Sequence, residues 1–388
     1  MARSLDVCIR GGGIVGHVLA LLLARERLRV GLVVAPAPAT ADVRAYALNQ
    51  RSRNMLERLR CWPPGDAATA VSRMQVAETG GGGVSFEADA LAVPALAWIV
   101  DVPVLEAQLA QAVRFQPQIE WLDAPCDARL TVICEGRGSE SRRQLGVEQD
   151  VTVYPQWAIA TRLSCALPHQ QTACQWFTPS DILGLLPMQG PSGNLVAAVW
   201  SIPSEFKNDL LEAPQDMFVQ KLQSACGDRF GSMQLAGRRA AWPLQLAMAR
   251  RWSGQQDGKA WVLAGDAAHA VHPLAGQGLN LGLADVQALA REIHGRAYWR
   301  GVDDARMLRR YERARKADVA VMASATDGLQ QLFGRPGNPW QSLRHWGMRG
   351  FDNSGLLKSW VARQAMGLSD DAPEPETPSR PLSLTGPA

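Results

Sequence analysis

Three glycines near the start of the chain have the spacing of a turn that binds a dinucleotide. Gly11, Gly13 and Gly16 form a GxGxxG pattern between an apolar stretch, residues 5–9, and an apolar helical stretch, residues 17–27. The first glycine permits a sharp turn, the second leaves room for a pyrophosphate, and the third lets the helix pack closely on the strand. Free N–H groups at the helix N-terminus then favour phosphate. The predicted binding residues are Gly11, Gly13, Ile14, Val15 and Gly16.

A second glycine-rich segment follows a predicted buried strand at residues 261–264. It supplies Asp266, whose carboxylate can accept hydrogen bonds from polyol hydroxyls. Pro273 predicts a rigid turn, and glycines at 276 and 278 let the backbone approach a flat ligand. A helix that begins near Gly278 directs its N–H groups at that ligand and stabilises negative charge there. The predicted binding residues of this segment are Asp266, Pro273, Gly276, Gly278, Leu279 and Asn280.

Other kinds of chemistry find little support in the 388 residues. Seven cysteines occur without a CxxC pair, which is typical of reduced thiols in the cytosol. His269 and His272 lie three residues apart, but no second ligand pair accompanies them, so we expect structural roles and no metal site. The net charge of +3 is too small to indicate a nucleic-acid partner. We therefore expect no catalytic side chain and no metal ligand.

The two motifs, in this order and about 250 residues apart, resemble those of the group A FAD-dependent aromatic hydroxylases, the para-hydroxybenzoate hydroxylase-like superfamily. Further segments are similar to the ubiquinone-biosynthesis hydroxylase branch. They are residues 44–49, residues 177–187 and residues 356–368. The resemblance covers residue 4 to about residue 370.

The resemblance implies that FAD carries the chemistry. In that family NADPH or NADH reduces the flavin, O₂ forms a flavin C4a-hydroperoxide, and a hydroxyl group passes to an electron-rich ring. The protein orients the reactants and excludes water. The expected substrate is a small aromatic molecule, a phenol or a polyprenylated quinone precursor. The implied activity is that of an FAD-dependent NAD(P)H monooxygenase.

The resemblance also assigns roles to single residues. Asp266 becomes the contact of the ribityl chain and pyrophosphate, and residues 278–280 offer backbone groups to the flavin pyrimidine edge. Arg44 becomes an FAD contact. Residues 135–142 are similar to the family's DGxxSxxR segment, so Glu135 becomes a cofactor-binding residue although aspartate is usual there.

Three more positions depart from the family pattern. Arg10 precedes the first glycine, where an apolar residue is normal. Ala35 stands near the end of the second predicted strand, where an acidic residue would hold the ribose hydroxyls. Val102 occupies a position that is polar in the family. These departures, together with Glu135, keep open a variant that has lost part of its activity.

The expected fold class is α/β: a Rossmann-like FAD-binding domain of the GR2 type, an inserted antiparallel β-sheet substrate domain, and C-terminal helices. Short β-prone stretches alternate with proline and glycine between residues 151 and 242, which indicates the inserted sheet. The FAD-binding domain is expected at residues 1–75, 101–150 and 244–325. The substrate domain is expected at residues 76–100 and 151–243, the C-terminal helices at residues 326–368, and a disordered tail at residues 369–388.

Two rival interpretations keep FAD and change the function. One is another FAD-dependent oxidoreductase on the same scaffold, and the other is a non-catalytic FAD-binding scaffold in a ubiquinone-biosynthesis complex. The sequence predicts no membrane span and a cytoplasmic protein. Association with a membrane surface or a biosynthetic complex stays open, with Trp340, Trp346 and Trp360 as candidate contacts, and so does a homodimer.

Overall fold

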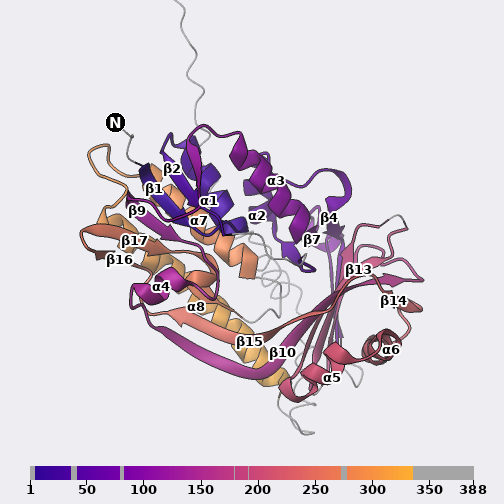
Figure 1. The fold of residues 1–388 in the computed structure, drawn as a ribbon. Coiled ribbons are helices and arrows are strands. Elements are labelled where there is room, and N and C mark those ends of the chain that lie inside the picture. The colour runs from indigo at the N-terminus through magenta and orange to yellow at the C-terminus, as the bar shows by residue number, and fades with distance from the viewer. Residues whose placement is uncertain are drawn as a thin grey trace, which may run out of the picture.

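The structure, a computed structural model, describes residues 5–35, 42–78, 83–178, 180–190, 192–271 and 278–334. Two large sheets lie side by side, with helices packed around the first (Figure 1). The α/β class that the sequence predicts is confirmed. Residues 335–368 of the expected C-terminal helices and the tail expected at residues 369–388 lie outside the described residues. The boundaries of the domains stay predictions.

The first sheet is parallel except for one edge strand. Its central strands are apolar because helices cover the faces of a parallel sheet, and Val7 and Ile9 of the N-terminal strand are fully buried. Only β16 runs antiparallel to its neighbour. In spatial order the strands are β16 (Ser253–Gln256), β17 (Lys259–Leu263), β9 (Ala128–Ile133), β1 (Leu5–Arg10), β2 (Val30–Val33) and β8 (Ile119–Leu122).

Helices from distant parts of the chain share the core of this sheet. Helix α1 (Ile14–Arg25) contacts both α3 (Val102–Arg114) and α7 (Gly278–His294), and α7 contacts α8 (Ala305–Gly334). The contact of α1 with α7 brings the two glycine-rich motifs of the sequence together. Helix α2 (Gln50–Arg58) begins at Asn49, whose side chain accepts a hydrogen bond from the Ser52 amide.

The second sheet is mostly antiparallel. Strands β11 and β5 form a parallel pair, which joins an early hairpin to the later strands. The sheet order is β18 (His269–Ala270), β15 (Ala240–Ala249), β10 (Gln149–Cys165), β13 (Leu195–Pro203), β12 (Ile182–Met188), β11 (Thr172–Phe177), β5 (Arg73–Glu78) and β6 (Gly83–Glu87), with β14 (Met233–Leu235) paired to β10. A third, small sheet contains β3 (Ala45–Leu48), β7 (Ala97–Asp101) and β4 (Ala68–Val71).

Two features of the second sheet differ from the sequence expectation. The two stretches expected near residues 151–154 and 158–163 are one strand, β10, whose register shifts between Val153 and Trp157. With β15 it forms a long curved pair that runs from the first sheet to the second (Figure 1). The region also contains two helices, α5 (Lys207–Glu212) and α6 (Gln215–Cys226). Helix α6 packs on the sheet through the buried side chains of Phe218 and Leu222, whose spacing is helical.

Candidate cofactor and substrate site

The turn between β1 and α1 needs glycine at two positions for reasons within the protein. Gly11 has a φ of +119°, and a Cβ atom there would lie 2.4 Å from the carbonyl oxygen of Cys134. A Cβ atom at Gly16 would lie 1.9 Å from the carbonyl oxygen of Gly11. The chain turns sharply and α1 packs directly on the turn. Both glycines are therefore requirements of the fold itself.

Gly13 has no such internal reason. Its backbone is extended, with a φ of −80°, and a Cβ atom would lie more than 4 Å from every other described residue that is not its chain neighbour. It is the N-cap of α1, no side chain caps the helix there, and the first turn contains no acidic residue. Gly13, Ile14 and Val15, at the N-terminus of α1, line an open cavity. This arrangement fits a bound pyrophosphate.

Asp266 lies where β17 ends. The short 3-10 turn η4 (Gly265–Ala267) carries it, and Gly265 has a φ of +64°. The Asp266 carboxylate is about half exposed, and Oδ2 lies 3.7 Å from Nε of Arg137. Asp266, Arg137 and Gly13 line one cavity. The structure therefore brings the second motif to the helix N-terminus of the first.

The start of α7 also reaches this cavity. Gly278 and Leu279 line it, and a Cβ atom at Gly278 would meet no atom of the described residues within 4 Å. Asn280 is buried, and its side chain is used inside the protein. Its Oδ1 accepts hydrogen bonds from the Asn49 amide at 3.0 Å and from Ser52 Oγ at 2.8 Å. Asn280 therefore anchors α7 to the start of α2. Pro273 and Gly276 lie outside the described residues.

Arg44 lines the cavity as part of an ion pair. Its Nε lies 2.9 Å and 2.8 Å from the two carboxylate oxygens of Asp42, and its Nη1 donates to Tyr46 Oη at 3.0 Å. Burial opposes the charge on Arg44, but the hydrogen bonds to Asp42 outweigh it and raise the pKa of Arg44. Burial, with the charge of Asp42 adding to it, raises the pKa of Glu106 on the same wall. The Asp42 carboxylate therefore holds the Arg44 side chain in place and stabilises its charge.

Glu135 does not line the cavity. Its Oε2 accepts from Ser139 Oγ at 2.7 Å and from the Ser141 amide at 3.0 Å, and its Oε1 accepts from Ser141 Oγ at 2.6 Å. These bonds hold the loop before α4 (Glu140–Gln144). Arg137, which the sequence reasoning missed, lies in that loop and lines the cavity. Its signal was a basic residue at a variable position of the DGxxSxxR-like segment.

The cavity encloses about 310 Å³ and joins the glycine-rich turns to the second sheet. On β12, Ile182, Gly184 and Leu186 face the cavity, and Leu183 and Leu185 pack into the opposite core. This alternation is the period of a strand. Val102, at the start of α3, also lines the cavity. The two glycine-rich turns and the apolar face of the second sheet therefore line the same cavity.

The cavity-lining residues fit FAD. Gly13 and Gly278, each at the N-terminus of a helix, line the cavity, and Arg137 adds a positive charge there. Asp266 offers a carboxylate for polyol hydroxyls. Fold and site together are those of a flavoprotein, in which glycine-rich helix N-termini and an apolar sheet face line one cavity. The chain belongs to the FAD binding domain family, whose model matches residues 123–326.

Known proteins resemble the chain over most of its length. Ubiquinone hydroxylase UbiL of Rhodospirillum rubrum is 29% identical and covers 98% of this chain and 93% of its own. The 3-demethoxyubiquinol 3-hydroxylase of Escherichia coli is 29% identical, over 94% and 98% of the two chains. The Pseudomonas aeruginosa PqsL structure with 2-aminobenzoylacetate has a TM-score of 0.73 at 19% identity, over 89% and 99%.

These findings confirm the expected resemblance to the ubiquinone-biosynthesis branch of the FAD-dependent aromatic hydroxylases. They confirm FAD as the expected cofactor. Among the helices that the structure describes, none combines the length and apolar character that a membrane span requires. The individual binding residues stay predictions, although the cavity collects most of them.

Proposed function

We propose that the protein is an FAD-dependent monooxygenase that hydroxylates a phenolic quinone precursor with O₂ and NADH or NADPH. The observation that carries the proposal is the single cavity, which runs from the N-termini of α1 and α7 to the apolar face of the second sheet. When bound, FAD supplies the activation of O₂, which protein side chains cannot provide. The relatives named as ubiquinone hydroxylases support a ring of that class.

The chain's own groups would bind and orient the reactants. The N–H groups at Gly13 and Gly278 would hold the anionic parts of FAD, and Arg137 would offset phosphate charge. Asp266 would accept hydrogen bonds from the ribityl hydroxyls. All three regions line the cavity.

The sheet side of the cavity would hold the aromatic ring. Ile182, Leu186 and Val199 provide apolar contacts, and Ser201 provides a hydroxyl that can bond a phenol group. An apolar wall also excludes water from the reacting atoms, which limits wasteful side reactions. Tests should therefore include phenols with an apolar substituent beside unsubstituted ones.

The test is isolation of the protein followed by cofactor release and isotope labelling. Heat-denatured protein should release FAD, identified by chromatography. NADH or NADPH should be oxidised faster when a suitable phenol is present, and ¹⁸O₂ should place one labelled oxygen in the product, read by mass spectrometry. A protein that binds FAD but inserts no labelled oxygen into any phenol of the panel would contradict the proposal.

A further inference from the structure

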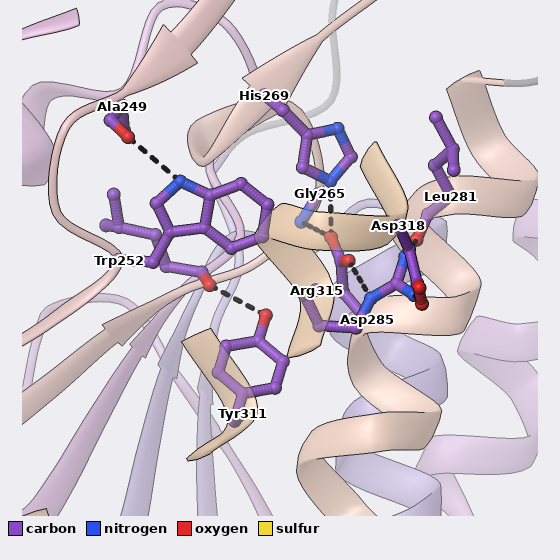
Figure 2. Close-up of polar contacts among 10 residues, drawn as sticks. Ala249, Trp252, Gly265, His269, Leu281, Asp285, Tyr311, Arg315 and Asp318 are labelled. Carbon is purple, nitrogen blue, oxygen red and sulfur yellow. Dashed lines mark hydrogen bonds and ion pairs between the residues drawn. The ribbon is translucent and has the colours of Figure 1, made fainter. Parts of the chain in front are cut away.

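A buried carboxylate lies directly behind the backbone segments that line the cavity. Asp285, on α7, accepts three hydrogen bonds (Figure 2). Its Oδ2 lies 2.9 Å from the Gly265 amide nitrogen and 2.6 Å from Nε2 of His269, and its Oδ1 lies 2.8 Å from Nε of Arg315. None of the functions derived above uses Asp285 or its partners.

The cluster is charged and closed to solvent. The Asp285 side chain is fully buried and that of Arg315 is 5% exposed. Burial opposes ionisation of Asp285, but His269 and Arg315 outweigh it and lower the pKa of the carboxyl group. The remaining Arg315 nitrogens reach Asp318 Oδ2 at 2.6 Å and the Leu281 carbonyl at 3.4 Å. A buried ion pair usually adds little net stability, so stability alone does not explain why Asp285 and Arg315 are buried at this place.

That position connects two cofactor-facing segments. Gly265 and Asp266 line the cavity, as do Gly278 and Leu279 at the start of α7. Asp285 holds the Gly265 amide from a point two turns along α7, and through Arg315 it is linked to the Leu281 carbonyl near the helix start. The Asp285 carboxylate therefore fixes the distance between the two segments.

Close packing at Gly282 supports this interpretation. A Cβ atom at Gly282 would lie 2.9 Å from Val15 Cγ2 and 3.3 Å from Gly265 Cα. Helix α7 thus presses against both the start of α1 and the Gly265 turn. Val15 also lines the cavity. The three segments expected to hold the cofactor meet at one point, and Asp285 supplies the polar bonds there.

His269 links a third stretch of backbone, strand β18, to Asp285. Its ring is 1% exposed and stacks on Trp252, with centroids 5.1 Å apart and planes 28° apart. Trp252 Nε1 in turn donates to the Ala249 carbonyl at 3.0 Å. His269 precedes Ala270 and Val271, which line the cavity. Its bond to Asp285 therefore fixes this stretch relative to α7.

We propose that Asp285 is a positioning residue for the cofactor: its carboxylate holds the Gly265–Asp266 turn, strand β18 and the start of α7 in the arrangement that binds FAD. The inference rests on the proposed function, because it requires that this cavity hold FAD. It predicts that loss of the carboxylate affects FAD affinity separately from the stability of the apoprotein.

The first test is Asp285→Asn. FAD is titrated into apoprotein, and its dissociation constant is read from quenching of flavin fluorescence. We expect the constant to rise about tenfold, because the neutral amide has one acceptor oxygen where the carboxylate has two, so it cannot accept from Gly265, His269 and Arg315 together. The visible absorption spectrum of bound FAD should also change, since the flavin surroundings shift. An unchanged constant with an unchanged spectrum would overturn the proposal.

A second pair of variants covers the case in which Asp285→Asn does not fold, because it leaves Arg315 buried without its full partner. His269→Leu removes one donor to the carboxylate and leaves the Asp285–Arg315 pair intact. His269→Gln keeps an N–H donor. We expect His269→Leu to raise the FAD dissociation constant about fivefold, with His269→Gln closer to the unsubstituted protein. Equal constants for His269→Leu and the unsubstituted protein would overturn the proposal.

Tyr311→Phe is the matched control. Tyr311 is buried in the same core and donates to the Leu263 carbonyl at 2.9 Å, and neither of these two residues lines the cavity. Its loss should lower the melting temperature of the apoprotein and leave the FAD dissociation constant within about twofold. A rise in that constant as large as the rise in Asp285→Asn would show general destabilisation and overturn the proposal. If the unsubstituted protein binds FAD and hydroxylates a phenol, such a result leaves the proposed function standing.

Discussion

Arg10 and Glu135 both form a hydrogen bond with the hydroxyl group of Ser141. Arg10 Nη1 donates to Ser141 Oγ at 3.1 Å, and Ser141 Oγ donates to Glu135 Oε1 at 2.6 Å. Both residues depart from the family pattern, and the structure shows that they belong to one network. The extra methylene of Glu135 lets its carboxylate reach Ser139 and Ser141 together. The two departures are therefore parts of the same local arrangement.

The first prediction concerns this network. Glu135→Asp shortens the side chain by one methylene group, so at least one of its three hydrogen bonds is lost. We expect the free energy of unfolding to fall by about 1–2 kcal/mol, measured by urea denaturation of the apoprotein. Glu140→Asp is the control, because Glu140 is exposed and its contacts with Arg143 and Gln144 lie within α4. Equal stabilities for the two variants would contradict the role assigned to Glu135.

The second prediction separates the glycines of the first motif. Gly16→Ala places a Cβ atom 1.9 Å from the Gly11 carbonyl oxygen, so we expect a loss of about 3 kcal/mol or more, or insoluble protein. Gly13→Ala meets no atom of the described residues within 4 Å, so the apoprotein should lose only about 1 kcal/mol, the difference between glycine and alanine at a helix N-cap. Its FAD dissociation constant should rise about tenfold or more, since the methyl group occupies the space for pyrophosphate. Tight FAD binding by Gly13→Ala would refute the pyrophosphate assignment.

The third prediction addresses the sheet side of the cavity. A Cβ atom at Gly184 would meet only the Val199 carbonyl oxygen, at 3.7 Å, which is an ordinary contact. Gly184→Leu should therefore fold, retain FAD and fill the space for the ring. We expect phenol-dependent product formation to fall about tenfold or more, with the FAD dissociation constant unchanged. Leu183→Met, on the opposite face of β12, is the control; it should retain activity within about twofold.

The fourth prediction concerns pH. Burial lowers the pKa of His17, whose Nδ1 donates to the Gly13 carbonyl at 3.0 Å and whose Nε2 is buried without a hydrogen-bond partner among the described residues. Below a pH of about 6.5, His17 therefore binds a proton in the unfolded chain, whereas in the folded chain it stays neutral until the pH is lower. Stability should fall by up to about 1.4 kcal/mol per pH unit from this group below that value, and not above it.

His17→Leu removes this titration. Urea denaturation of the apoproteins at pH 7.5 and 5.5 should show a smaller acid loss in the variant than in the unsubstituted protein. His169, whose pKa burial also lowers, keeps its own contribution in both proteins. An identical acid loss in the two proteins would contradict the buried, neutral state of His17.

The sequence predicted the parts of the site that depend on backbone. Gly11 and Gly16 have spacing that only a tight strand–turn–helix unit explains, and Asp266 follows a buried apolar strand, so both motifs could be placed without a structure. The direction in which a side chain points could not be predicted from the sequence. Whether Glu135 turns towards the cavity or caps α4 depends on Ser139 and Ser141, whose positions are set by the folded loop.

Elements of the second sheet were harder to predict for a related reason. Helix α6 is short, and its apolar residues are few, so its periodicity was hidden among β-prone neighbours. Strand β10 contains Pro155 at its irregularity, which on the sequence resembles a break between two strands. Pairing with β15 carries β10 through that point. The pairing partner lies some 90 residues away in the chain, so the local sequence pattern does not predict the pairing.

The parallel pairing of β5 with β11, and of β17 with β9, has a consequence for biosynthesis. Each sheet closes only when segments far apart in the gene have both been translated: residues 73–78 wait for residues 172–177, and residues 128–133 wait for residues 259–263. Long-range pairing of this kind is slow and leaves apolar edges open meanwhile. We therefore expect the growing polypeptide to expose these strand edges until both members of each pair have been synthesised.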